Sequence, residues 1–152
     1  MSLDALEGVY LVENFPRMLK YKEDVFHKQH NTRMAIDDID AREVGSQRVM
    51  AKSHAWQSWE NVFAIKKAIE SSGWKSRKDD KLVIEALEGL TLDNSLGHPQ
   101  GAKTIRREDH SGMIDCYISR VENGRWEVKK KVSKEELMAQ LPTRVDFSKQ
   151  DI

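Results

Sequence analysis

The chain has 152 residues, the length of one domain with a single hydrophobic core. Its 25 basic and 25 acidic residues give a formal net charge of zero, which argues against the basic excess expected of a nucleic-acid-binding protein. No run of 18 apolar residues occurs, so we expect no membrane-spanning helix, and residues 1–4 lack the basic start and apolar stretch of an export signal.

The first elements along the chain are predicted to be a strand and a helix. Residues 8–12 form a short apolar and β-branched run, which predicts a buried strand. After Pro16, apolar residues recur at three-, four- and seven-residue offsets, which predicts a helix over residues 17–31. Residues 32–50 show neither period, so we expect an irregular connection there.

The clearest helical pattern begins at Ser53. Apolar residues recur at helical spacing as far as Gly73, and Ser53 is expected to cap the start of this helix. A second helix, capped by Asp79 or Asp80 and reaching Leu90, carries its apolar residues on one face. We predict that the two helices form a helical hairpin or a stacked pair.

The last third of the chain is predicted to be mainly extended. A loop rich in glycine precedes two predicted strands, over residues 113–121 and 125–132. Between them, Asn123 and Gly124 are typical of the two-residue turn of a β-hairpin. Ser133 opens a short capped helix, which a proline ends. The fold class is therefore α/β, with helices packed on a small sheet and a C-terminal β-hairpin.

The predicted hairpin carries two features whose orientation can be predicted. Ile114, Cys116 and Ile118 alternate along the first strand, so we expect the only cysteine to point inward and to be unreactive. Residues 129–131 are all lysine, and we expect them to form a solvated edge that discourages strand pairing.

Two groups of polar residues could carry chemistry, but neither is compelling. His27 and His30 lie three residues apart on the first predicted helix, without a nearby third metal ligand. Asp109 and His110, next to Ser111, have the residue types of an acid–base pair with a nucleophile, yet adjacent residues rarely reach the required geometry. The sequence also lacks a phosphate loop, a nucleophile elbow and a zinc-binding helix. We therefore predict a protein that is not an enzyme and binds no cofactor and no metal.

Three large side chains lie at the start of the long helix. His54, Trp56 and Trp59 could meet a ligand there, because the first turn of a helix has free amide N–H groups and the rings offer apolar faces. The same side chains could belong to the core. Spacing alone favours the core and leaves both interpretations open.

Four segments follow one another along the chain: residues 7–12, residues 53–62, residues 83–90, and Gly97 with residues 106–110. In this order they resemble the C-terminal part of the branched-chain amino acid binding protein family, over about residues 5–132. The combination carries the resemblance, since no single segment is specific.

The resemblance implies a type I periplasmic-binding-protein fold, in which two α/β lobes close around a ligand. It implies an amino acid or small amide as ligand, an ABC permease in the membrane as partner, and a periplasmic or other extracytoplasmic location for the full-length protein. Residues 1–152 would then be a single domain, the C-terminal fragment of a longer parent. The family position for an aromatic wall of the cleft falls on His54 or Trp59, which become the ligand-binding candidates, and Trp56 is expected in the core.

A fragment of a two-lobed protein exposes surface that the missing segments would cover. We therefore expect a homo-oligomer, formed through strand edges or through the helix face that carries Trp59 and Phe63. The alternative is a small free-standing protein–protein interaction module, whose likeness to the transport family is architectural only.

Overall fold

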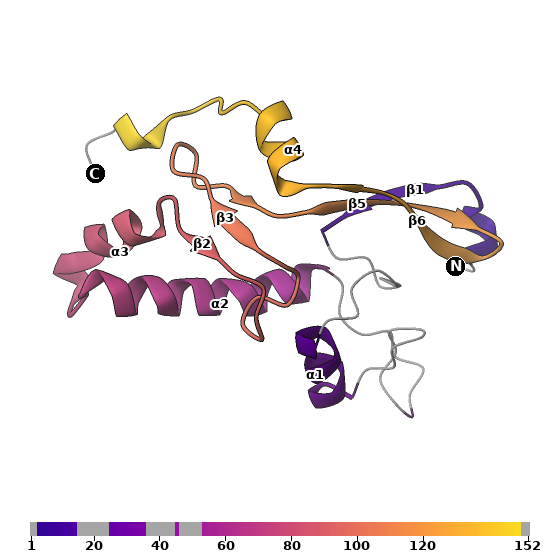
Figure 1. Ribbon diagram of the computed structural model, residues 1–152, viewed down its shortest axis with the longest axis horizontal. Coiled ribbons are helices and arrows are strands. Elements are labelled where there is room, and N and C mark those ends of the chain that lie inside the picture. The colour runs from indigo at the N-terminus through magenta and orange to yellow at the C-terminus, as the bar shows by residue number, and fades with distance from the viewer. Residues whose placement is uncertain (1–2, 15–24, 36–44, 46–52, 150–152) are drawn as a thin grey trace.

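The computed structural model describes residues 3–14, 25–35, 45 and 53–149. Within them lie two three-stranded antiparallel sheets, one with strand order β1-β5-β6 and the other with order β2-β3-β4 (Figure 1). The long β5–β6 hairpin extends away from the helical part of the molecule, whereas β2 and β3 lie beside helix α2 (Figure 1). The predicted mixture of helices and sheet is therefore present, but it contains two small sheets.

Strand β1 (Tyr10–Glu13) pairs antiparallel with β5 (Cys116–Glu122) and lies at an edge of its sheet. A strand was predicted here, but the prediction that it is buried is wrong. Tyr10 is 61% exposed and Val12 is 65% exposed. An apolar run indicates a strand, and only its neighbours decide whether it is covered. A short 3-10 helix, η1 (Leu3–Leu6), precedes β1.

The first two helices are α1 (Val25–Arg33) and α2 (Ser53–Ser72). The prediction of a helix over residues 17–31 agrees with α1 from residue 25, and its earlier part lies outside the described residues. Helix α2 has the predicted extent. Gly73 follows it with a φ of +73°, the left-handed conformation in which helices commonly end.

The buried face of α2 follows a four-residue spacing through Trp56, Glu60, Ala64 and Ala68. Trp56 packs against Tyr117 of β5 and belongs to the core, as expected. The apolar spacing did not predict that a carboxylate would lie within this buried stripe. Glu60 therefore needs partners inside the fold.

A 3-10 turn, η2 (Arg77–Asp79), leads into α3 (Asp80–Leu87), which contacts α2 as predicted. Asp79 stands at the N-cap of α3, but its carboxylate accepts from the backbone N–H of Ser76 and so caps η2 instead. The helix ends before the predicted Leu90, because Gly89 turns the chain with a φ of +73°.

The second sheet consists of β2 (Thr91–Leu92), β3 (Lys103–Ile105) and β4 (Gly112–Met113). The first sheet continues from β5 into β6 (Arg125–Val132). Asn123 and Gly124 form the turn between them, with φ of +53° and +68°, as the two-residue turn requires. The first strand of the hairpin begins at Cys116, and not at the predicted residue 113, because Met113 pairs with β3 in the other sheet.

Strand β5 buries Tyr117, Ser119 and Val121 on one face. Cys116 lies on the opposite, less buried face, so its predicted inward orientation is wrong. The thiol accepts a hydrogen bond from Asn14 Nδ2 at 3.0 Å, and burial raises its pKa, which keeps the thiol protonated and disfavours reaction.

The hairpin is followed by α4 (Lys134–Gln140) and by a 3-10 turn, η3 (Phe147–Lys149). Ser133 caps α4 as predicted, because its hydroxyl accepts from the backbone N–H of Glu136 at 3.1 Å. In the parts of the chain that are described, every helix is too short or too polar to cross a membrane.

Candidate ligand-binding site

Trp59, one of the two predicted ligand-binding residues, is half-buried on α2 and contacts the β2–β3 loop, which comprises residues 93–102. Its indole Nε1 donates to the backbone oxygen of Leu96 at 3.0 Å. Its ring also lies 5.2 Å, centroid to centroid, from that of Phe63 one turn later. These two contacts hold the indole in one orientation against the loop.

The loop approaches Phe63 so closely that a side chain on Gly97 would fit only if the ring or the loop moved. A Cβ atom on Gly97 would lie 3.0 Å from two ring atoms of Phe63. His98 then meets the same ring edge-on, with centroids 6.5 Å apart and an interplanar angle of 75°. Trp59, Phe63 and His98 are thus three rings in consecutive contact, two on α2 and one on the loop.

A buried carboxylate joins α2 to the same loop. Glu60 Oε1 accepts from the backbone N–H of Gln100 at 2.8 Å, and Glu60 Oε2 lies 2.8 Å from Lys103 Nζ at the start of β3. The side chains of Glu60 and Lys103 are 0% and 8% exposed. A charge is retained at such depth only when it is paired, so these contacts fix where the loop rejoins the sheet.

His98 is 6% exposed, and burial lowers its pKa from 6.5 to about 4, with smaller contributions from the charges of Lys103 and Lys67. The imidazole is therefore neutral near pH 7. Its buried Nδ1 has no hydrogen-bond partner among the described residues. A neutral imidazole presents one donor and one acceptor, so this ring can act as either toward a polar group that reaches it.

A groove of about 370 Å³ lies between α2 and the β2–β3 loop. Its walls include two apolar and four charged side chains: Phe63, Leu92, Lys66, Lys67, Glu70 and Asp93. Lys66 and Glu70 are an exposed ion pair at 2.7 Å, so the groove carries both charges without a net excess of either. The groove is open to solvent, and of the three rings Phe63 and His98 line it.

The two predicted ligand-binding residues lie five residues apart on α2. His54 lies in the first turn of α2, and its side chain is outside the described part of the structure. The role of His54 stays a prediction, as does that of Trp59. The side chains of His27 and His30 are likewise undescribed, and no three His, Cys, Asp or Glu side chains gather as a metal site in the segments that are described.

Asp109 and His110 do not form an acid–base pair. Asp109 Oδ1 accepts from Arg106 Nε at 2.9 Å and from the backbone N–H of Ser111 at 3.1 Å, and the hydrogen bond from Arg106 lowers the pKa of the carboxyl to about 2. His110 Nε2 instead lies 3.1 Å from Glu88 Oε1. These residues build the β3–β4 turn.

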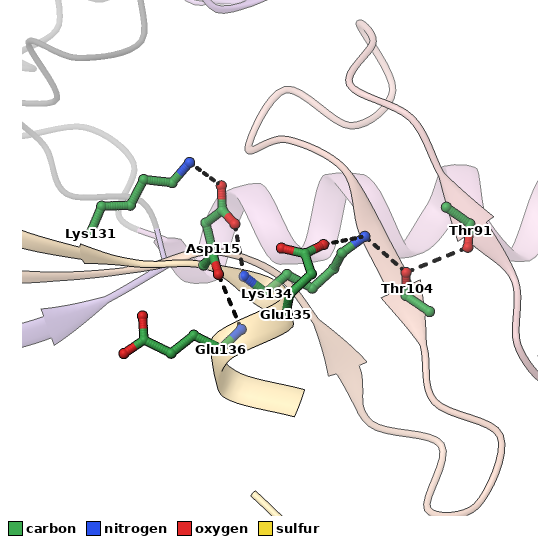
Figure 2. Close-up of polar contacts among 8 residues, drawn as sticks. Thr91, Thr104, Asp115, Lys131, Lys134, Glu135 and Glu136 are labelled. Carbon is green, nitrogen blue, oxygen red and sulfur yellow. Dashed lines mark hydrogen bonds and ion pairs between the residues drawn. The ribbon is translucent and has the colours of Figure 1, made fainter. Parts of the chain in front are cut away.

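A second polar cluster joins the two sheets near the start of α4 (Figure 2). Asp115 accepts from the backbone N–H of Lys134 at 3.0 Å and pairs with Lys131 Nζ at 2.7 Å. Lys134 Nζ donates to Thr104 Oγ1 on β3 at 3.0 Å, and Thr104 Oγ1 lies 3.4 Å from Thr91 Oγ1 on β2. This cluster therefore connects α4 and the hairpin to the second sheet.

No protein-family model matches the chain, and no curated protein matches its sequence. Among solved structures, the chain is similar to the solute-binding protein of an ABC transporter from Rhodopseudomonas palustris BisB5, crystallised in complex with 3,4-dihydroxy benzoic acid. The TM-score is 0.60 at 18% sequence identity, over 86% of this chain. The chain spans 32% of that protein's length. At this level of identity the likeness shows the fold: the chain is built like part of a solute-binding protein.

Proposed function

We propose that this chain is a single domain from the C-terminal part of an extracytoplasmic solute-binding protein, and that the parent captures a small solute for an ABC importer without transforming it. The observation that carries the proposal is the fold, because 86% of the chain matches a protein of that class. The match covers only 32% of the other protein, which supports a longer, two-lobed parent.

In such a parent the ligand would be clamped between two lobes. A ligand drives closure only when it contacts the closed state better than the open one, so each lobe has to supply preformed contacts. This chain would supply an aromatic wall at the start of α2, formed by Trp59 and His54. The fit of Trp59 to this role rests on its hydrogen bond to Leu96, which orders the indole before any ligand arrives.

The proposed ligand is a branched-chain amino acid or a small amide, and the proposed partner of the closed form is the membrane permease. The sequence resemblance over residues 53–62 and 83–90 supports this class of ligand. The similar solute-binding protein was crystallised with an aromatic acid, so the ligand class is the part of the proposal that binding experiments have to decide.

We also propose that the isolated chain self-associates, through strand edges or through a face of α2 other than the one first expected. Trp59 and Phe63 are not a free face, because the β2–β3 loop lies against both. Among the described residues, the large apolar side chains of α2 that are exposed are Val62 and Ile65, and those of β1 include Tyr10. These residues form exposed apolar surface of the kind that an absent lobe or a second copy of the chain would cover.

The test is a calorimetric titration of the full-length parent with leucine, isoleucine, valine and short amides. We expect Trp59→Ala to weaken binding by about 1.5 to 3 kcal/mol, the contribution of covering a leucine-sized side chain. His54→Ala should weaken it in the same direction. Asn61→Ala, an exposed polar position on the same helix, is the matched control and should leave the affinity unchanged. Equal affinities for the wild type and Trp59→Ala would remove Trp59 from the site.

A further inference from the structure

Glu60 is a charged residue at a buried position where the stability of the fold does not require a charge. It lies in the middle of the buried stripe of α2, where its spacing from Trp56 and Ala64 calls for an apolar side chain. A buried ion pair is a poor source of stability, because desolvation of both ions offsets their attraction, and well-packed apolar residues often do as well. The carboxylate is therefore better explained by what it orients.

We infer that Glu60 is a positioning residue, whose buried carboxylate fixes the β2–β3 loop so that Trp59 of the proposed aromatic wall, and Phe63 in contact with it, keep their orientation. That this positioning serves ligand binding rests on the proposed function. The positioning itself is a property of the chain without ligand.

The geometry places Glu60 among the residues that hold the loop. Three α2 side chains reach nearby points of the loop, Trp59 at Leu96, Phe63 at Gly97 and Glu60 at Gln100. The first contact is one neutral hydrogen bond and the second is van der Waals contact. The third is made by an ionised, fully buried group, and hydrogen bonds to such groups are the stronger and more directional kind.

A carboxylate is suited to this position because one oxygen can accept a hydrogen bond from one element while the other forms an ion pair with a second element. Oε1 accepts from the backbone N–H of Gln100 at the end of the loop, and Oε2 is ion-paired with the ammonium group of Lys103 at the start of β3. An apolar side chain of the same size would fill the space but leave the amide of Gln100 without this acceptor. The loop would then keep its contacts with Trp59 and Phe63 but lose this anchor at Gln100.

Two matched double variants separate positioning from charge. Glu60→Gln with Lys103→Met keeps an oxygen acceptor for the amide of Gln100, whereas Glu60→Met with Lys103→Met does not. Both remove the buried charges together, so neither leaves an unpaired ion, and glutamine and methionine have similar length. Glu60→Leu with Lys103→Met is a second apolar variant, used alongside the methionine one so that the result does not depend on a single variant folding.

The measurement is hydrogen exchange by NMR on this chain without ligand, at the Gln100 amide and the Trp59 indole N–H. The Val121 amide, which donates to Val9 at 3.0 Å in the β1–β5 sheet, reports global stability. We expect the apolar variants to lose on the order of 10- to 100-fold protection at Gln100 relative to Val121, with a loss in the same direction at Trp59, and the glutamine variant to keep both.

Equal protection of the Trp59 indole in the glutamine and apolar variants would overturn the inference. So would losses that are the same at Gln100 and at Val121, since a purely structural role lowers all protection together. The exchange result does not depend on which solute the parent binds. If the parent bound none of the proposed ligands, the proposed function would be refuted, but the exchange result would still decide whether Glu60 positions the loop.

Discussion

Two ion pairs of nearly equal length connect separate elements of this fold in very different surroundings. Glu60 and Lys103 lie 2.8 Å apart with side chains 0% and 8% exposed, whereas Asp115 and Lys131 lie 2.7 Å apart with side chains 22% and 53% exposed. Solvent screens the second pair and not the first. Distance is thus a poor guide to importance here, and burial decides what the loss of one partner does.

The largest effect is expected at the buried pair. Glu60→Ala leaves the ammonium group of Lys103 and the amide of Gln100 without this partner, which should lower the free energy of unfolding by about 3 to 5 kcal/mol. Urea unfolding measures the change. Adding Lys103→Met to Glu60→Ala should restore part of the loss, and a single-variant loss below about 1 kcal/mol would place this pair in the same class as an exposed one.

A pH effect of similar origin is expected at His98, on the same loop. Its pKa is about 4 in the folded chain against 6.5 ordinarily, so the unfolded state binds the proton more readily between these values. Stability contributed by the neutral ring is complete above pH 6.5 and is lost as the pH falls toward 4, by about 3 kcal/mol in all. Urea unfolding near pH 6.5 and near pH 4 should show that His98→Gln loses less stability between the two values than the wild type does. Equal losses of stability in the two proteins would contradict the lowered pKa of His98.

The close contact at Gly97 should give an intermediate effect. Gly97→Ala places a Cβ atom 3.0 Å from the ring of Phe63, so the ring or the loop must move. We expect a loss of about 1 to 3 kcal/mol and faster exchange of the Trp59 indole N–H. Gly112→Ala, where the nearest atom would be 3.6 Å away on Lys103, is the control. If both variants unfolded at the same urea concentration, the close contact between Gly97 and Phe63 would have no effect on stability.

The smallest effect is expected at the exposed pair. Lys131→Met removes the partner of Asp115, but Asp115 remains solvated and still accepts from the backbone N–H of Lys134. The expected loss is about 0.2 to 1 kcal/mol, and it should shrink further as salt is added. Lys103→Met should cost more stability, because its partner Glu60 is buried. Similar losses of stability in Lys131→Met and Lys103→Met would contradict the claim that burial decides the effect.

Local patterns predicted the elements well, because their causes lie within a few residues. The extent of α2, the Asn123–Gly124 turn and the cap at Ser133 are all of this kind. Burial was predicted poorly where it depends on distant neighbours. Strand β1 is apolar but lies at an edge, and Cys116 faces away from the buried side of β5.

In the candidate site, too, local features could be predicted from the sequence and long-range contacts could not. The sequence predicted Trp59 as a ligand-binding candidate, yet its contact with Leu96 spans 37 residues and follows no short pattern. A signal for Glu60 was present, since it is a charged residue at four-residue spacing within a buried helical stripe. Such a residue indicates a buried partner, although the sequence does not say that the partner is Lys103.

The most direct test of the proposed origin in a two-lobed protein is calorimetry of this chain alone with leucine, isoleucine and valine. A zwitterion loses hydration at both charged ends, and charge-assisted hydrogen bonds have to replace it. One aromatic wall supplies only about 1.5 to 3 kcal/mol, against roughly 8 kcal/mol for micromolar affinity. We expect no saturable heat from the isolated chain. A saturable micromolar signal would mean that a complete site lies within these residues, and it would contradict the proposal that this chain is one part of a longer binding protein.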